Sequence, residues 1–360
     1  MINEVYVFGE DDWKNISNDV ECLTVDYEIK IWPKLPTSLK QLYCSYNDIT
    51  ELPELPNSLE YLDANGNNLT NINNLPKSLK CLSCSNNKIK NIINLSEGLK
   101  ILSCSNNNIK NLDNLPESLI ELNCSNNNIK NLDNLPESLI ELNCSNNQLT
   151  ELPILHNLLE KLDCSNNNIE NVDDLPESLI KLNCSDNNIK NLDNLPNSLK
   201  ELSCRKNGLK KLNKLPEFLI ALNCSSNKLK DLPILPESLK SLDCSNNEID
   251  KINITDFNIS KINCSNNNIE VLPNLTVDIN KYFYNFDFSN NPVKRIPNNS
   301  TYKNILHNQD KDYINNKAYE WIKNDPTTFD MILPHLTEEK QKEFHIRKNR
   351  ENKLNKILNE

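Results

Sequence analysis

The chain has very little glycine, 4 residues among 360. Glycine supplies the left-handed backbone of tight turns and of loops that approach a phosphate closely, so its scarcity excludes GxGxxG, GxxxxGK[ST] and GxSxG sites. There is also no apolar run of about 18 residues, so the sequence predicts no membrane-spanning helix. The first residues, MINEVYVFGEDDW, lack the basic and apolar regions of a signal peptide, and a cytoplasmic location is expected.

A basic surface is missing as well, because the formal net charge is -11. This charge argues against nucleic-acid or anionic-membrane partners, which require clustered lysine and arginine. Histidine is equally scarce, with four residues, and neither His156 nor His307 lies beside a recognisable nucleophile motif. We therefore expect no enzymatic activity and no cofactor.

What the chain does have is a strict period of 20 residues. Residues 108–127 and 128–147 are identical, which indicates tandem duplication. Such a period is typical of a solenoid, in which every unit forms one turn. Eleven of the thirteen cysteines occupy one position of the period, with Ala64 in the single gap; they are Cys44, Cys84, Cys104, Cys124, Cys144, Cys164, Cys184, Cys204, Cys224, Cys244 and Cys264.

One unit, taken from Leu39, reads LKQLYCSYNDITELPELPNS. Over about residues 20–297 this pattern resembles the leucine-rich repeat, with cysteine in place of the second strand leucine. The 20-residue form is similar to repeat proteins of giant amoeba-infecting DNA viruses and, more distantly, to short-repeat bacterial effectors. Some of those effectors carry a ubiquitin-ligase domain with a cysteine nucleophile, but no cysteine follows Cys264 here. The resemblance implies an α/β repeat solenoid that binds proteins.

The residues themselves predict the same architecture. Alternation in 41–45 points Leu42 and Cys44 inward, and Gln41, Tyr43 and Ser45 outward. Each unit then contributes one short strand to a curved parallel sheet of about thirteen turns. On the convex side, LPxLPxS segments such as 52–58 favour extended or 3-10 backbone over long helices.

Two columns are expected to form structural ladders inside the solenoid. Asparagine side chains turned inward can pair with backbone groups of adjacent turns. Cysteines in the other column, such as Cys44, Cys84, Cys124 and Cys164, could form disulfides, bind metal or act as nucleophiles, but packing as reduced thiols is favoured. No metal is expected, because Cys81 and Cys84 point to opposite faces of a strand. The asparagine column comprises Asn47, Asn67, Asn87, Asn107, Asn127, Asn147, Asn167, Asn187, Asn207, Asn227, Asn247, Asn267 and Asn291.

The period defines three parts of the chain. Residues 1–38 are predicted to form an N-terminal cap and a degenerate first repeat, with Thr24 and Tyr27 in the cysteine and asparagine columns. Residues 39–297 form the solenoid, in which Phe286 and Phe288 take the inward columns of the last strand. Residues 298–360 are predicted to form a small helical C-terminal cap or tail, with helical spacing at Ile314, Ala318 and Ile322 and a last helix from Thr337 to about Leu358.

Most of the outward strand face is predicted to be a field of small polar groups, including a serine column at Ser85, Ser105, Ser125, Ser145, Ser165 and Ser185. Apolar departures suit a protein partner, although the N-terminal cap could fold over them instead. Basic departures suit an acidic partner or reflect drift of one exposed repeat. These candidate partner-binding residues are Tyr43, Tyr46, Tyr61, Cys81, Ile101, Arg205 and Lys206.

The sequence therefore predicts a non-enzymatic protein-protein interaction scaffold that binds a partner on its concave strand face. Alternatives are an adaptor such as a substrate receptor of a ubiquitin ligase, a host-directed effector, or a structural protein of a particle. Residues 1–38 contain no F-box-like helical sequence, which disfavours the ligase adaptor.

Overall fold

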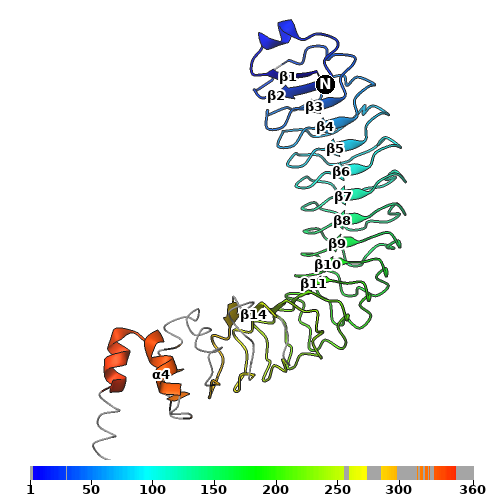
Figure 1. Cartoon of the computed structure of the whole chain (residues 1–360). Helices are drawn as coiled ribbons and strands as arrows, with labels where there is room; N and C mark the ends of the chain where they lie inside the picture. Colours follow the sequence, from blue (N-terminus) through cyan, green and yellow to red (C-terminus); the bar gives the residue numbers. More distant parts are fainter. Residues whose placement is uncertain are drawn as a thin grey trace, which may run out of the picture. The chain divides into compact units, whose positions relative to one another are not determined.

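The computed structural model describes residues 3–29, 31–254, 259–273, 285–297 and 328–345, together with residues 314, 317, 318, 321, 322 and 324. The chain divides into two compact units, Met1–Leu199 and Lys200–Glu360. Each unit is a stack of turns with one short strand per turn (Figure 1). The division into residues 1–38, 39–297 and 298–360 stays a prediction.

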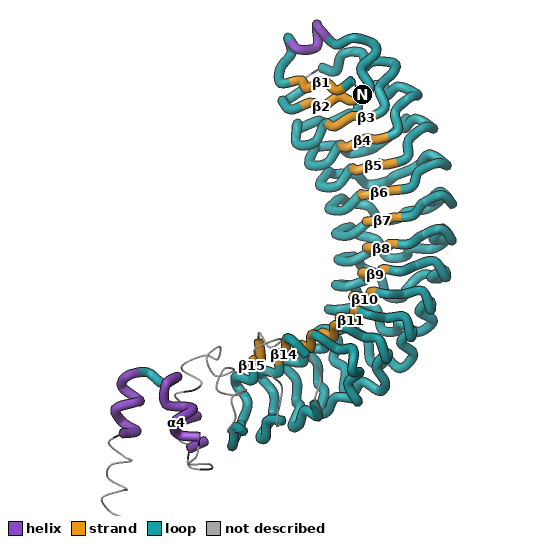
Figure 2. The backbone as a smooth tube through the Cα atoms, in the orientation of Figure 1, coloured by secondary structure: helices purple, strands orange, loops and turns teal. Residues whose placement is uncertain are grey.

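Within each unit the strands follow one another in chain order (Figure 2). Every described pairing is parallel. The first unit contains β1 (Glu4–Val7), β2 (Cys22–Val25), β3 (Gln41–Tyr43), β4 (Tyr61–Asp63), β5 (Cys81–Ser83), β6 (Ile101–Ser103), β7 (Glu121–Asn123), β8 (Glu141–Asn143), β9 (Lys161–Asp163) and β10 (Lys181–Asn183). The second contains β11 (Glu201–Ser203), β12 (Ala221–Asn223), β13 (Ser241–Asp243), β14 (Lys261–Asn263) and β15 (Asn285–Asp287). Helical segments are η1 (Asp12–Asn15), α4 (Phe329–Ile332), η3 (Leu333–His335) and residues 338–345.

The core consists of inward columns of leucine, isoleucine and cysteine. Leu42 and Cys44 are fully buried, as the alternation of the strand predicts. Neighbouring strands keep the same residues in register, for instance Leu122 against Leu142. Full burial of one such leucine contributes about 2 kcal/mol, but a single turn has no second apolar face to pack against. Stacking of the turns therefore supplies the hydrophobic stabilisation.

The asparagine ladder that the sequence predicts is present, and Asn107 illustrates it. Its Nδ2 donates to the carbonyl oxygens of Cys104 (3.1 Å) and Ser105 (3.1 Å) in its own turn and of Cys84 (3.0 Å) in the preceding turn. Its Oδ1 accepts from the backbone N–H of Ile89 at 2.9 Å. One carboxamide thus satisfies buried backbone groups of two consecutive turns.

The outer segments end in a tight turn, in which a serine hydroxyl forms hydrogen bonds with the preceding turn. The Leu59 N–H donates to the Pro56 carbonyl oxygen at 3.1 Å, a spacing of three residues as in a 3-10 turn. Ser58 Oγ reaches back to the carbonyl oxygens of Thr37 (2.8 Å) and Leu39 (2.7 Å). The other residues of segment 52–58 form neither helix nor strand, so the expected absence of long helices on this side is confirmed for this segment.

The N-terminal prediction contains a register error. Cys22 pairs with Gln41 and Thr24 with Tyr43, so Thr24 lies on the outward face of β2. Val25, which is 2% exposed, takes the inward position that the strict 20-residue period gives to Thr24. The turn between β2 and β3 is one residue shorter than the period, and a shift of one residue along a strand exchanges its two faces.

The helical C-terminal segment packs against the last turn of the second unit. Phe286 and Phe288 are buried in the inward columns of β15, as predicted. Trp321 is fully buried, its ring centroid lies 6.1 Å from that of Phe288, and its indole N–H donates to the Val293 carbonyl oxygen at 2.7 Å. Ile314 and Ala318 are also buried. Residues 338–345 are helical, as expected after Thr337, whereas the continuation to Leu358 lies outside the described residues.

All thirteen cysteines are free thiols. Burial raises the pKa of the Cys84 thiol to about 12, and burial followed by the neighbouring Cys104 raises the pKa of Cys124 well above its ordinary value. A group whose pKa is raised by burial stays neutral at physiological pH, so these thiols are packed as small apolar side chains.

Substitution of Asn107 by alanine should lower the stability of the stack by about 3 kcal/mol, because several buried backbone groups lose their partner at once. The exposed neighbour Asn108 provides a matched control, and Asn108→Ala should change stability by less than about 0.5 kcal/mol. Urea unfolding followed by far-UV circular dichroism measures both changes. Equal effects of the two substitutions would contradict a structural role for the column.

Thiol reactivity tests the packing of the cysteine column. At pH 8 in native buffer, a chromogenic disulfide reagent should modify Cys81, which is only half-buried, and leave the other twelve cysteines unmodified over the same time. Burial keeps the reagent away from these twelve thiols, whereas the half-buried Cys81 is accessible. All thirteen should react within minutes in denaturant, and rapid reaction of most of them in native buffer would rule out this packing.

Candidate functional site

The outward face of the first unit carries an apolar cluster on four consecutive strands, here called the strand-face patch: Tyr43, Tyr61, Cys81 and Ile101. Tyr61 pairs with Cys81 and Cys81 with Ile101, so these three side chains form one column. Tyr43 belongs to the adjacent column, where it lies opposite Asp63. The structure thus brings together four of the seven residues that the sequence singled out for partner binding.

The two tyrosines of the strand-face patch pack against each other. Their ring centroids are 5.0 Å apart and their planes are inclined by 38°. Burial, and then the Asp63 carboxylate, raises the pKa of the Tyr61 hydroxyl to about 12. Both hydroxyls therefore remain protonated and able to donate a hydrogen bond, and the ring contact holds the side chains in a defined orientation.

Carboxylates border the strand-face patch. Glu121 continues the column after Ile101, and Asp63 lies beside Tyr43. Both raise the pKa of the Cys81 thiol, although burial is the larger cause. Further along the same column, Glu141 and Lys161 form an ion pair. The patch is thus apolar at its centre and acidic at its rim.

The N-terminal strands do not fold over the strand-face patch, which was the alternative interpretation of the sequence. Strands β1 and β2 extend the sheet beyond β3 in chain order. Tyr43 and Tyr61 remain half-buried, and Ile101 is 36% exposed. The patch is consequently partly exposed to solvent on the described surface of the first unit.

Sequence reasoning missed two aromatic residues close to the strand-face patch. Tyr6 lies in the column of Thr24 and Tyr43, and it is 53% exposed. Its ring stacks on Phe8 with centroids 6.3 Å apart. The alternation of Val5 and Val7 with Glu4, Tyr6 and Phe8 was the available signal, because it indicates a strand with one outward aromatic face.

Tyr46 lies in the turn after β3 instead of in a strand column. Its backbone has a φ of 58°, and its side chain is 77% exposed. Gly66, with a φ of +63°, makes room for this ring, because a Cβ at residue 66 would overlap the ring carbons of Tyr46. Tyr46 is therefore an exposed aromatic at the edge of the strand face and not a member of the patch.

Arg205 and Lys206 belong to the second unit and are not part of the strand-face patch. Both are exposed in the turn after β11, and Lys206 has a φ of 54°. In this turn Asn207 Nδ2 still donates to the Cys204 carbonyl oxygen at 3.0 Å. The basic substitutions therefore alter the surface charge while the asparagine contact within the turn is kept.

The serine column is not the exposed field that the sequence suggested. Ser125 and Ser165 are 5% and 6% exposed. Ser125 Oγ donates to Asn123 Oδ1 at 2.8 Å, and Ser165 Oγ donates to Asp163 Oδ1 at 2.6 Å. The same contact, from the serine hydroxyl back to the preceding asparagine or aspartate, is present after β7, β8, β9, β12, β13 and β14. The exposed part of the outward strand face is thus narrower than the sequence predicts, because these serines are buried.

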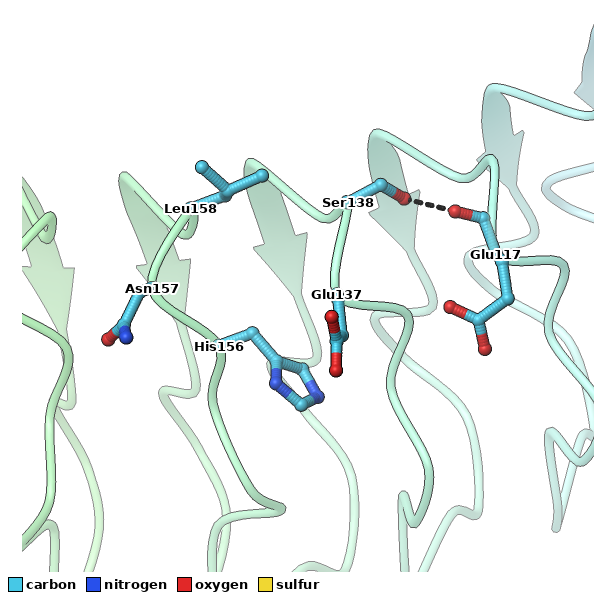
Figure 3. Close-up of a pocket in the computed structure, with 6 residues that line it drawn as sticks. All are labelled: Glu117, Glu137, Ser138, His156, Asn157 and Leu158. Atoms are coloured by element: carbon cyan, nitrogen blue, oxygen red, sulfur yellow. Dashed lines mark hydrogen bonds between the residues drawn. The ribbon is translucent and has the colours of Figure 1, made fainter.

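A surface hollow of about 570 Å³ lies at the outer turns of the first unit (Figure 3). His156 takes the place of the usual proline and Leu158 that of the usual serine, and Glu117, Glu137 and Asn157 complete the lining with Ser138. The hydroxyl of Ser138 donates to the backbone oxygens of Glu117 (2.6 Å) and Leu119 (2.7 Å). Because this hydroxyl is engaged with the backbone, the hollow does not present an activated nucleophile.

Two features are absent from the described residues. Within them, no three His, Cys, Asp or Glu side chains converge closely enough to bind a metal ion. The same part of the chain contains no helix with the length and hydrophobicity needed to cross a membrane.

Comparison with known proteins places this geometry in a family. No family model and no curated protein matches the chain. Among solved structures, YopM from Yersinia enterocolitica is 34% identical over 77% of this chain and 65% of its own, with a TM-score of 0.66. The chain thus spans just under two thirds of that relative. A YopM structure from Yersinia pestis, described as a leucine-rich effector protein, is 31% identical over 69% of this chain and 83% of its own, with a TM-score of 0.56.

A third structure shares the fold. The functional domain of InlJ from Listeria monocytogenes, described as including a cysteine ladder, has a TM-score of 0.64 and 23% identity over 82% of this chain and 67% of its own. The leucine-rich repeat resemblance expected from the sequence is confirmed by these comparisons. The chain belongs to the leucine-rich repeat family.

Proposed function

We propose that this protein is a non-enzymatic scaffold that binds a partner protein on its strand face, with the strand-face patch as the main contact. The observation that carries the proposal is the packed pair Tyr43 and Tyr61, continued by Cys81 and Ile101 on an otherwise polar face. Aromatic side chains held rigidly by the backbone bind with little loss of side-chain entropy, and they dominate the energetics of protein interfaces.

The rim of the patch indicates the chemistry of the partner. Glu121 and Asp63 lie beside the apolar centre, and the chain carries a net charge of -11. A partner that inserts an apolar side chain and flanks it with lysine or arginine would satisfy both features. This complementarity also disfavours nucleic acids and anionic membranes as ligands.

The cellular setting is part of the proposal. The relative from Yersinia pestis is described as an effector protein, and by analogy we propose that this chain acts on proteins of a host. A column of buried free thiols is most stable where the surroundings are reducing, so the host cytoplasm is the proposed location. The giant-virus resemblance stays a prediction.

Replacement of Tyr43, Tyr61 and Ile101 by serine tests the proposal. In a native pull-down from host-cell cytoplasm, the wild-type chain should retain one stoichiometric client, identified by mass spectrometry. The triple variant should bind the purified client at least about tenfold more weakly, because hot-spot aromatics are lost. Half-buried surface residues contribute little to the core, so the melting temperature should fall by only a few degrees.

A matched triple variant in the same column controls for general changes of the surface. Glu141→Ser, Lys161→Ser and Lys181→Ser replace three outward residues of β8, β9 and β10 and remove the Glu141–Lys161 ion pair as a whole. This variant should retain the client. A collapse of stability in the tyrosine variant would show that the patch is core, and equal loss of binding in both variants would refute a localised contact.

A further inference from the structure

Within the described residues, no strand pairs with the outer side of β1, the first strand of the first unit. The N–H groups of Cys22 and Asp26 donate to the carbonyl oxygens of Asn3 (3.1 Å) and Val7 (2.9 Å). In a parallel strand, alternate residues bond to opposite neighbours, so the backbone groups of Glu4 and Tyr6 face away from β2. Strand β1 is the first in the sheet order of the described residues.

Apolar groups accompany this free edge. Val5 points inward in the leucine column, yet it is only half-buried, whereas Leu23 in the next turn is fully buried. On the outward face, Phe8 is 65% exposed and stacks on Tyr6. The last turn of the second unit is different, because the fully buried Trp321 packs against it. Among the described residues, the first turn thus leaves the outer backbone side of β1 without a strand partner and Val5 half-buried, while Val7 is fully buried.

Three carboxylates lie in or near β1: Glu4 in the strand, Asp12 in η1 and Asp19 in the connection to β2. Glu4 Oε1 accepts from the Tyr6 hydroxyl at 2.9 Å, and Asp12 Oδ2 accepts from the Phe8 N–H at 2.8 Å at the end of the strand. Asp19 lies near the start of the strand, where hydrogen bonds from Ser17 and Asn3 lower the pKa of its carboxyl. A second copy of this chain would bring the same three carboxylates to the contact, which disfavours self-pairing.

We propose that the edge of β1 binds an extended, basic segment of a partner protein by parallel strand addition. Backbone groups of the core-facing residues of the added strand form hydrogen bonds with those of Glu4 and Tyr6. The same pattern occurs within the sheet, where the N–H of core-facing Cys44 donates to the Asp63 carbonyl oxygen of the next strand at 2.8 Å. These residues are apolar, because they continue the column of Val5. The alternate residues lie beside Glu4 and are basic. This inference goes beyond the strand-face contact and does not depend on it.

The dye-labelled peptide Lys-Val-Lys-Val-Lys-Val-Lys serves as the probe, and fluorescence anisotropy measures its binding to the full chain. N-methylation of the three valines removes the N–H groups that face β1, whereas N-methylation of the three internal or C-terminal lysines modifies the opposite edge of the added strand. We expect the first modification to weaken binding at least about tenfold and the second to change it less than about twofold. The peptide Glu-Val-Glu-Val-Glu-Val-Glu should not bind.

Variants of the protein locate the contact. Tyr6→Pro removes the backbone N–H that faces the free edge without removing a β1–β2 hydrogen bond, and it should weaken the peptide at least about tenfold. Tyr6→Ser keeps that N–H and should bind much more tightly than Tyr6→Pro. The variant with Tyr43, Tyr61 and Ile101 replaced by serine should bind the peptide normally, which separates this inference from the proposed function.

Three results would overturn the inference. One is equal binding of the two N-methylated peptides to the wild-type chain. This comparison does not use the Tyr6→Pro variant, so it remains valid even if that variant fails to fold. Another is equal binding of the Glu-Val peptide. The third is a dimer in light scattering that Tyr6→Pro abolishes, because a second copy would then be the occupant of the edge.

Discussion

Each stack of turns depends on the hydrogen bonds that its buried asparagine carboxamides make with the backbone. A chain with one strand of three residues per turn has many backbone groups that strand pairing leaves unpaired, and almost no glycine to relax the turns. The Nδ2 of Asn107 donates to carbonyl oxygens of two turns, and its Oδ1 accepts from the Ile89 N–H. The backbone polar groups at the bend after the strand thus have protein partners. Leucine and cysteine then fill the interior that this frame defines, and the outward strand residues are free to vary.

Much of this arrangement could be predicted from the sequence, because repetition makes the constraint visible. The inward positions of Leu42 and Cys44 and the pairing of the asparagine column follow from a period that recurs many times. Prediction failed where repetition is broken or where side chains interact locally. The turn before β3 is one residue short, so Val25 and not Thr24 is buried. The burial of Ser125 results from a contact with Asn123, which alternation along a strand does not reveal.

The candidate site could be predicted in part for the same reason. Departures from a uniform repeat identified Tyr43, Tyr61, Cys81 and Ile101, and the strand registers bring them together. Tyr6 lies before the regular period and was missed, although it occupies the column of Tyr43. The proposed function thus rests on the exceptions to the repeat, and the repeat itself provides the surface on which those exceptions lie.

Hydrogen exchange of two backbone amides tests the central claim most directly. The N–H groups of Ile89 and Ile169 donate to Asn107 Oδ1 (2.9 Å) and Asn187 Oδ1 (3.0 Å), and both residues lie outside the two identical units. If the carboxamides hold the turns, both amides exchange as slowly as the amides of the neighbouring strands, in the regime of global or subglobal unfolding. If both exchange as fast as the amides of the exposed outer residues Asp113 and Asp133, the asparagine ladder does not support the fold.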